Sequence, residues 1–160
     1  MKRYLWSERL LEYSWTRTTS NAEDAENAEE TMKSEALNAL SGDTVDAAIR
    51  VHSTLGPGLL ESAYKACLTH ELRSRGHFVE TEVLLPVYYN SIRVDAAYRI
   101  DLLVESELVV ELKSIARLTD VHAAQLLSHL RLSQRRLGLL INFNVVHLRD
   151  GIKRIVNNLT

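Results

Sequence analysis

The stretch "RIDLLVESELVVELK", from Arg99 to Lys113, holds two carboxylates and a lysine at a spacing that could bring them together. It predicts two short strands joined by a turn centred on Ser106. With that turn, Asp101 lies opposite Glu111, and Lys113 shares their face because side chains alternate along a strand. The other face is apolar throughout, and it comprises Ile100, Leu102, Val104, Leu108, Val110 and Leu112.

Two opposed carboxylates are unfavourable in a sheet. The repulsion costs a strand pair up to about 1 kcal/mol in water, and the cost rises as water is excluded. A divalent cation reverses the sign, because Mg²⁺ often binds one or two carboxylates together with substrate phosphate. Lys113 could then stabilise the charge that develops on a phosphoryl group. The simpler and commoner alternative is a solvated outer face, as we expect for the turn residues Glu105 and Glu107.

The elements around this hairpin predict an α/β fold. The order α-α-β-β-β-α-β implies a four-stranded mixed sheet flanked by helices, with three antiparallel strands. The fourth strand is reached through a helix and should run parallel to a neighbour. We expect a helix from Asp43 or Thr44 to Gly56, a helix within 59–76, strands at 77–89, 92–104 and 107–115, a helix at 120–133 capped by Thr119, and a buried strand at 137–143.

Composition indicates one globular domain of ordinary size. The 160 residues are 46% hydrophobic and 25% charged. No apolar run approaches the ~20 residues of a membrane helix, so we expect no membrane partner. The single cysteine, Cys67, excludes an intrachain disulfide and suits a reducing compartment, so we expect a cytoplasmic protein. The net charge of −2 gives no indication of a nucleic-acid partner.

The N-terminal residues differ in composition from the rest. Residues 1–31 hold four basic and seven acidic residues, a net of −3, which leaves +1 for the other 129. The segment "TRTTSNAEDAENAEE" offers no apolar stripe with which to bury a core. We expect 1–31 to be a disordered or weakly ordered leader and 42–157 to be the functional domain. Met32 is then a candidate for the first residue of the functional chain.

Several collinear motifs give a family resemblance. The stretch "GPGLLESAYKACLTHELRSRG", the strand aspartate, "VELK" and "VHAAQLLSHLRL" together resemble the GxxExxY protein family. Its name motif is present as Gly58, Glu61 and Tyr64. That family is assigned to the PD-(D/E)XK nuclease-like superfamily, whose αβββαβ core has the order predicted above. The resemblance runs from about Thr44 to Val156, and residues 1–40 lie outside it.

The resemblance implies roles for particular residues. One departure is Ile100, which stands where the superfamily's name has a proline, at a position that varies widely. Without the motif, Glu61 would be an ordinary helix acid, and Tyr64 we expect to be structural. The resemblance implies Asp101, Glu111, Glu61 and the Leu112 carbonyl as ligands of Mg²⁺ or Mn²⁺, Lys113 as the catalytic lysine, and Gln125 as a residue that lines the site.

The expected function is a divalent-metal-dependent phosphodiesterase, a nuclease, acting on DNA or RNA. One alternative is a catalytically weak or inactive nuclease-fold module that binds nucleic acid or a protein partner. Another is an adaptor whose acids are merely solvated. A homodimer, with both sites acting on one duplex, is also open. His122 and His129 share a helix face with Gln125, but too few His and Cys ligands accompany them for a zinc site, and His122 fits an ordinary position in the first helical turn.

Overall fold

A computed structural model describes the backbone of residues 7–158 and the side chains of 21–95 and 98–158. The chain divides into two compact units, residues 1–38 and 39–160. The first helix, α1 (Ser7–Leu55), belongs to both. Within the part of the chain that is described, no helix combines the length and the apolar character needed to span a membrane.

Helix α1 does not begin where the sequence suggests. Residues 7–31 have helical backbone, and the helix continues through Asp43 and Thr44 to Leu55. The expected start at Asp43 or Thr44 is therefore wrong. The Asp43 carboxylate accepts hydrogen bonds from Arg75 and His77 instead of capping a helix. Gly56, with a φ of +69°, lies directly after the last helical residue as predicted.

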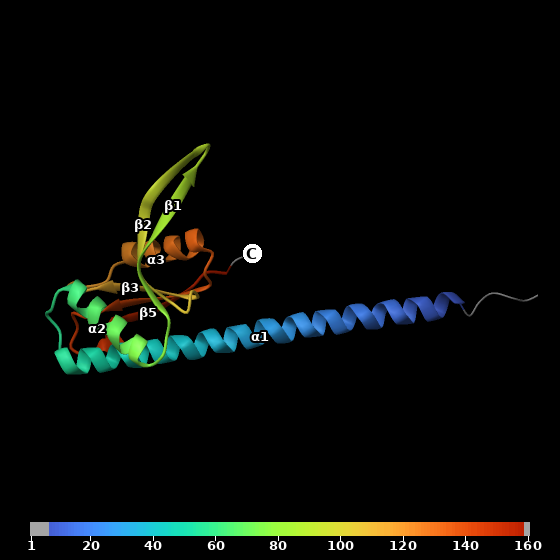
Figure 1. Cartoon of the computed structure of the whole chain (residues 1–160), viewed down its shortest axis with the longest axis horizontal. Helices are drawn as coiled ribbons and strands as arrows, with labels where there is room; N and C mark the ends of the chain where they lie inside the picture. The colour runs from blue at the N-terminus through green and yellow to red at the C-terminus, as the bar shows by residue number, and fades with distance from the viewer. Residues whose placement is uncertain (1–6, 159–160) are drawn as a thin grey trace, which may run out of the picture. The chain divides into compact units, whose positions relative to one another are not determined.

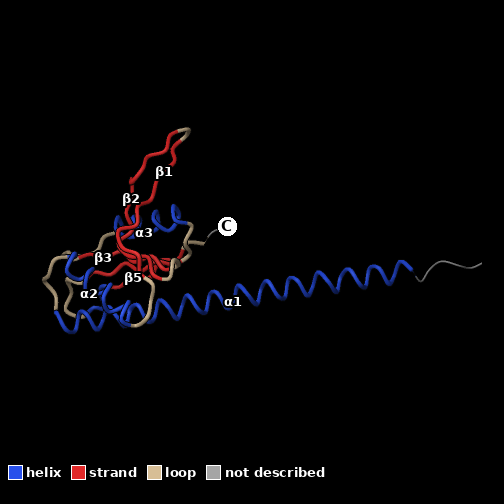
Figure 2. The backbone as a smooth tube through the Cα atoms, viewed as in Figure 1, coloured by secondary structure: helices blue, strands red, loops and turns tan. Residues whose placement is uncertain are grey.

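The sheet has one strand more than predicted. Its order is β1 (Val79–Tyr89), β2 (Ile92–Val104), β3 (Leu108–Lys113), β4 (Leu137–Asn142) and β5 (Ile152–Val156) (Figures 1 and 2). The first three strands are antiparallel and β4 runs parallel to β3, which confirms the predicted pairing.

The prediction of four strands is wrong because it omits β5, which pairs antiparallel with β4. β5 follows a 3-10 turn, η1 (Leu148–Gly151). It is only five residues long, and its exposed Lys153 and Arg154 are typical of an edge strand rather than of a core strand.

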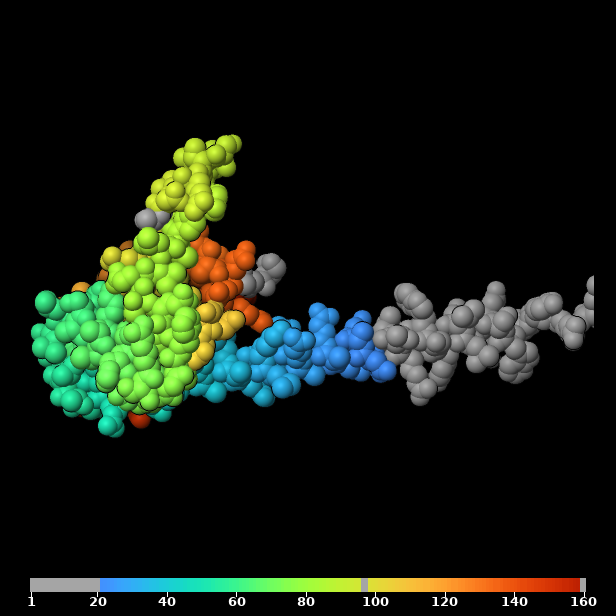
Figure 3. All heavy atoms as spheres, viewed as in Figure 1, coloured from blue at the N-terminus to red at the C-terminus, as the bar shows by residue number. Residues whose placement is uncertain are grey.

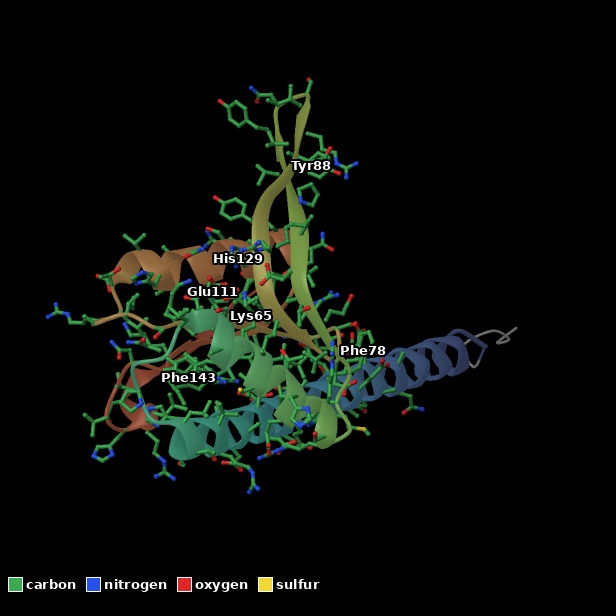
Figure 4. All side chains as sticks on the ribbon, turned by 60° about the vertical axis from the view of Figure 1, so that its left-hand side comes forward. Lys65, Phe78, Tyr88, Glu111, His129 and Phe143 are labelled. Atoms are coloured by element: carbon green, nitrogen blue, oxygen red, sulfur yellow. The ribbon has the colours of Figure 1, made fainter. Side chains whose placement is uncertain are left out.

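Two helices cover opposite sides of the sheet, α2 (Glu61–Ser74) and α3 (Asp120–Ser133) (Figures 1 and 4). Leu126 of α3 packs into a core cluster with Leu103 and Val109. A side chain at Gly138 would come within 2.8 Å of Leu126, so the glycine permits this close approach of helix and strand. The face that carries Asp101 and Glu111 is therefore covered, and the solvated alternative is wrong for it.

Strand β2 leaves the main sheet beyond its last three residues. Its ladder with β3 covers only Leu102 to Val104, whereas its ladder with β1 extends to Ile92. The two strands therefore continue as a two-stranded ribbon (Figures 1 and 3). An irregularity between Leu85 and Val87, at Pro86, interrupts the register. The acid pair lies where this ribbon joins the sheet.

Candidate active site

The predicted register of the hairpin is confirmed from Val104 and Leu108 to Leu102 and Val110. Asp101 and Glu111 follow directly beyond the last of these pairs. The ladder stops there because one oxygen of Asp101, Oδ2, accepts the backbone N–H of Leu112 at 2.9 Å. Both acids are buried, with 6% of Asp101 and 3% of Glu111 exposed.

Each buried carboxylate is paired with a lysine. Lys113 donates to Glu111 Oε1 at 2.7 Å, and Lys65 of α2 donates to Asp101 Oδ1 at 2.9 Å. Each carboxylate charge is thus offset by one ammonium group. The sequence pattern indicates Lys113 as a site residue but does not indicate Lys65. One signal was nevertheless available, since Lys65 lies one helical turn after Glu61 and therefore on the same helix face.

A second acid holds Lys65 from the other side. Lys65 also donates to Glu82 Oε1, and Glu82 Oε2 lies 2.6 Å from Arg99 Nε. Burial lowers the pKa of Lys65, but its hydrogen bonds with Glu82 and Asp101 outweigh that effect and raise it. The hydrogen bond from Lys65 lowers the pKa of Glu82. Lys65 is therefore a firmly protonated cation shared between two acids.

The third side chain at the acid pair is His129 of α3, which the sequence argument did not place in the site. Its Nδ1 lies 3.3 Å from Glu111 Oε2, and the residue is 1% exposed (Figure 4). Among the described residues, neither this oxygen nor either ring nitrogen has a hydrogen-bond partner. Burial raises the pKa of Glu111, yet His129 and Lys113 together lower it below its usual value.

The other two polar residues on this face of α3 play different parts. His122 Nδ1 accepts the backbone N–H of Thr119, 3.0 Å away. The residue therefore belongs to the N-terminal cap of α3, the ordinary position in the first helical turn that was expected. Gln125 is half-buried one turn before His129. Within the described part of the chain, it forms no hydrogen bond to the acid pair. The structure thus brings His129 into contact with Glu111.

Glu61 lies within electrostatic reach of the site. Its pKa is raised, first by burial and further by the charges of Asp101 and Glu111, while Lys113 acts in the opposite direction. The residue is the first of α2 and is half-buried. Helix α2 faces the hairpin, because it also supplies Lys65 to Asp101. A helix that faced away would have contradicted the predicted site.

Tyr64 explains the spacing of the Gly58, Glu61 and Tyr64 motif. Its hydroxyl donates to the Gly56 carbonyl at 2.6 Å and accepts the backbone N–H of Leu59 at 3.1 Å. Gly58 has a φ of +98°, which favours glycine. Tyr64 thereby fastens the loop that leads into Glu61, and the prediction of a structural role for Tyr64 is confirmed.

The site offers some, but not all, of the ligands that a divalent metal ion needs. In the described ranges, no group of three or more His, Cys, Asp and Glu side chains is arranged to hold one. The two carboxylates nevertheless offer hard oxygen donors, and Glu111 Oε2 is buried without a hydrogen bond. Two carboxylates with water and phosphate oxygens are a donor set that Mg²⁺ uses. The residues therefore fit a cation bound partly by its substrate.

The fold and the buried acid pair define a nuclease-like α/β protein. A family model described as the PD-(D/E)XK nuclease superfamily matches residues 38–155. The chain belongs to this superfamily. Searches among curated proteins and among solved structures gave no match.

Proposed function

We propose that this chain is a divalent-metal-dependent phosphodiesterase, a nuclease that acts on DNA or RNA, and that it belongs to the GxxExxY protein family. The observation that carries the proposal is the burial of two carboxylates, Asp101 and Glu111, on the neighbouring strands β2 and β3. Desolvating an ion costs several kcal/mol even when it is paired. The simplest reason for a nuclease-like fold to keep two such acids buried is that their negative charge serves the reaction.

The acids would hold the ion. We assign Asp101 and Glu111 as its main ligands, with Glu61 and the Leu112 carbonyl as further ones, and Mg²⁺ or Mn²⁺ as the ion. When bound, such an ion lowers the pKa of a coordinated water and neutralises charge on the phosphate. The bond from the Leu112 N–H orients the Asp101 carboxylate, because it fixes Oδ2 while Oδ1 faces Lys65.

Lys113 would act on the phosphate. Its ammonium lies 2.7 Å from Glu111 in a side chain that is 15% exposed, so the charge is next to the proposed metal ligand and still accessible from outside. There it would stabilise the negative charge that grows on the phosphoryl oxygens. Gln125 would line the same site from α3. All of these residues fall within the proposed functional domain, residues 42–157, outside the proposed leader at 1–31.

Partners and compartment follow from the same reasoning. The substrate would be nucleic acid, and a homodimer would let two sites act on one duplex. The half-buried thiol of Cys67 suits a reducing, cytoplasmic compartment.

The test is cleavage of a panel of DNA and RNA substrates with Mg²⁺ or Mn²⁺. Lys113→Ala is compared with the parent and with Lys153→Ala, which removes an exposed lysine of β5. We expect Lys113→Ala to lose about 10²- to 10³-fold in rate and Lys153→Ala to match the parent. Equal cleavage by all three would contradict the site, and no cleavage by any would favour a binding module.

A further inference from the structure

The outer part of the β1–β2 ribbon is unusually apolar for an exposed surface. We define the ribbon tip as residues 87–94. Of its side chains, Tyr88 is 68% exposed, Tyr89 67%, Ile92 59% and Val94 44%. Figures 3 and 4 show the tip standing clear of the helices, and Figure 4 labels Tyr88 in it. Contiguous exposed apolar side chains mark interaction sites, and a two-stranded ribbon gains little stability by itself.

Aromatic side chains lie on both faces of the ribbon tip. Tyr89 pairs with Ile92 and Val87 with Val94 on one face, whereas Tyr88 pairs with Arg93 on the other. The Arg93 guanidinium lies over the Tyr88 ring, 6.0 Å from its centroid. The tip therefore presents a flat ring on each face, and the Tyr88 ring is paired with a planar cation.

We propose that the ribbon tip binds the bases of an unpaired nucleic-acid strand whose backbone enters the acid site. This inference rests on the proposed nuclease function. Strand β2 connects the ribbon tip with the acid site, because it contains both Ile92 and Asp101. Nine residue steps span at most about 30 Å, which is the length of about nine stacked nucleotides at ~3.4 Å each. A single strand could thus contact both places at once.

The charges favour bases over phosphates as the contact. Arg93 lies 2.8 Å from Asp95, and Arg99 lies 2.6 Å from Glu82, so both ribbon arginines are already paired with acids. Duplex binding depends on several cations that neutralise phosphates, which this ribbon does not offer. Base stacking on an aromatic ring needs no net charge and contributes about 1–3 kcal/mol per base.

The two faces also argue against a protein occupant. A flat partner, including a second copy of this chain, would cover one face and leave either Tyr88 or Tyr89 in water. A flexible single strand of nucleic acid can place successive bases on both faces of the ribbon tip. Arg93 adds a planar cation beside Tyr88 on which a base can stack as well.

The experiment measures binding without cleavage. Fluorescence anisotropy in EDTA compares a labelled 20-nucleotide single strand with the matching duplex, using the full chain. Tyr88→Ala and Tyr89→Ala should each weaken single-strand binding by about 5- to 150-fold. Phe78→Ala is the matched control, because Phe78 is 59% exposed but precedes β1, outside the tip. Tyr88→Phe and Tyr89→Phe keep the ring and should keep the affinity.

Three results would overturn the proposal. The first is single-strand affinity that stays unchanged in folded alanine variants, as checked by circular dichroism. The second is tighter binding of the duplex than of the single strand. The third is a dimer that the alanine variants convert to monomer while single-strand affinity is unchanged, which would assign the tip to a second copy.

Cleavage separates this inference from the function on which it rests. If the parent cleaves, the tip variants should raise KM and leave kcat unchanged. If the parent never cleaves but the tyrosine variants still weaken binding, the nuclease proposal fails and the binding surface stands. If the parent cleaves and neither KM nor binding changes, the surface proposal fails and the nuclease proposal stands.

Discussion

Two clusters of charge in this molecule use similar contacts in different surroundings. In the acid site, Asp101 and Glu111 are almost fully buried beside two lysines. In a second cluster, His77 lies 2.6 Å from Asp43 and 3.2 Å from Glu105. About two-fifths of each of those acidic side chains remains exposed. The pairing distances are alike, and the burial differs.

The difference separates a structural cluster from a candidate functional one. The surface cluster joins α1, the segment after α2 and the β2–β3 turn, and it loses little hydration in doing so. The acid site gives up the hydration of two carboxylates and leaves Glu111 Oε2 without a hydrogen bond. An apolar pair would stabilise the fold at least as well. Removing charge should therefore lower activity at the acid site and lower stability at the surface cluster.

The largest expected effect comes from neutralising the acid pair. Asp101→Asn and Glu111→Gln keep the size of each side chain, and Asn at 101 still offers an oxygen to the Leu112 N–H. We expect kcat/KM on a cleaved oligonucleotide to fall by about 10²- to 10³-fold in variants that circular dichroism shows to be folded. Glu107→Gln, at an exposed acid of the β2–β3 turn, is the control. Activity within twofold of the parent in both site variants would remove the distinction between the clusters.

The next effect concerns the loop that carries Glu61. Tyr64→Phe deletes the hydroxyl that joins Gly56 and Leu59 but keeps the ring, which stacks on Phe143 at 4.4 Å. Two partly exposed backbone groups lose a partner, so we expect a loss of about 1 kcal/mol in the free energy of unfolding. Urea denaturation measures it, and Tyr89→Phe on the exposed ribbon should be neutral. An unchanged midpoint would show that the loop does not depend on this hydroxyl.

An effect of similar size distinguishes a cation site from a merely solvated pair. At a concentration ten times the dissociation constant, a bound ion stabilises the fold by about 1.4 kcal/mol. Mn²⁺ or Mg²⁺ should therefore raise the melting temperature of the parent. Asp101→Asn should abolish the shift, and His77→Gln should retain it. The same shift in all three proteins would place the ion elsewhere, and no shift in the parent would favour an adaptor.

The sequence predicts the parts of this fold that local chemistry determines. Alternating side chains and a short turn give the register that pairs Leu102 with Val110, as observed. Thr119 as a cap gives the start of α3, and the apolar run 137–143 gives a strand buried on both faces. In each case the deciding interactions lie within a few residues of one another.

What the sequence does not predict depends on packing between distant elements. Lys65 and His129 reach the acids from two helices on opposite sides of the sheet, and periodicity shows only which helix face they share. The start of α1 was missed because Asp43 binds Arg75 and His77, more than thirty residues away. Strand β5 was missed because an edge strand can be short and charged.

The smallest effect tests the surface cluster by pH. The hydrogen bond with Asp43 is the main reason that the pKa of His77 is raised, so folding favours protonated His77. Its contribution is present below the ordinary histidine pKa of about 6.5 and is lost as pH rises through the raised value. The same contact lowers the pKa of Asp43, whose contribution is lost as pH falls through that lowered value. The pair therefore stabilises the fold most between these two limits, by less than about 1 kcal/mol.

Urea midpoints at pH 5.5 and 8.5 measure this contribution. The parent should lose stability between the two values, and His77→Gln should lose less over the same interval. His70→Gln, at an exposed histidine of α2, should follow the parent. If His77→Gln kept the full pH dependence, the charge of His77 would contribute nothing. His77 would then hold the surface cluster together by neutral hydrogen bonds alone, and the contrast with the buried acid site would be sharper still.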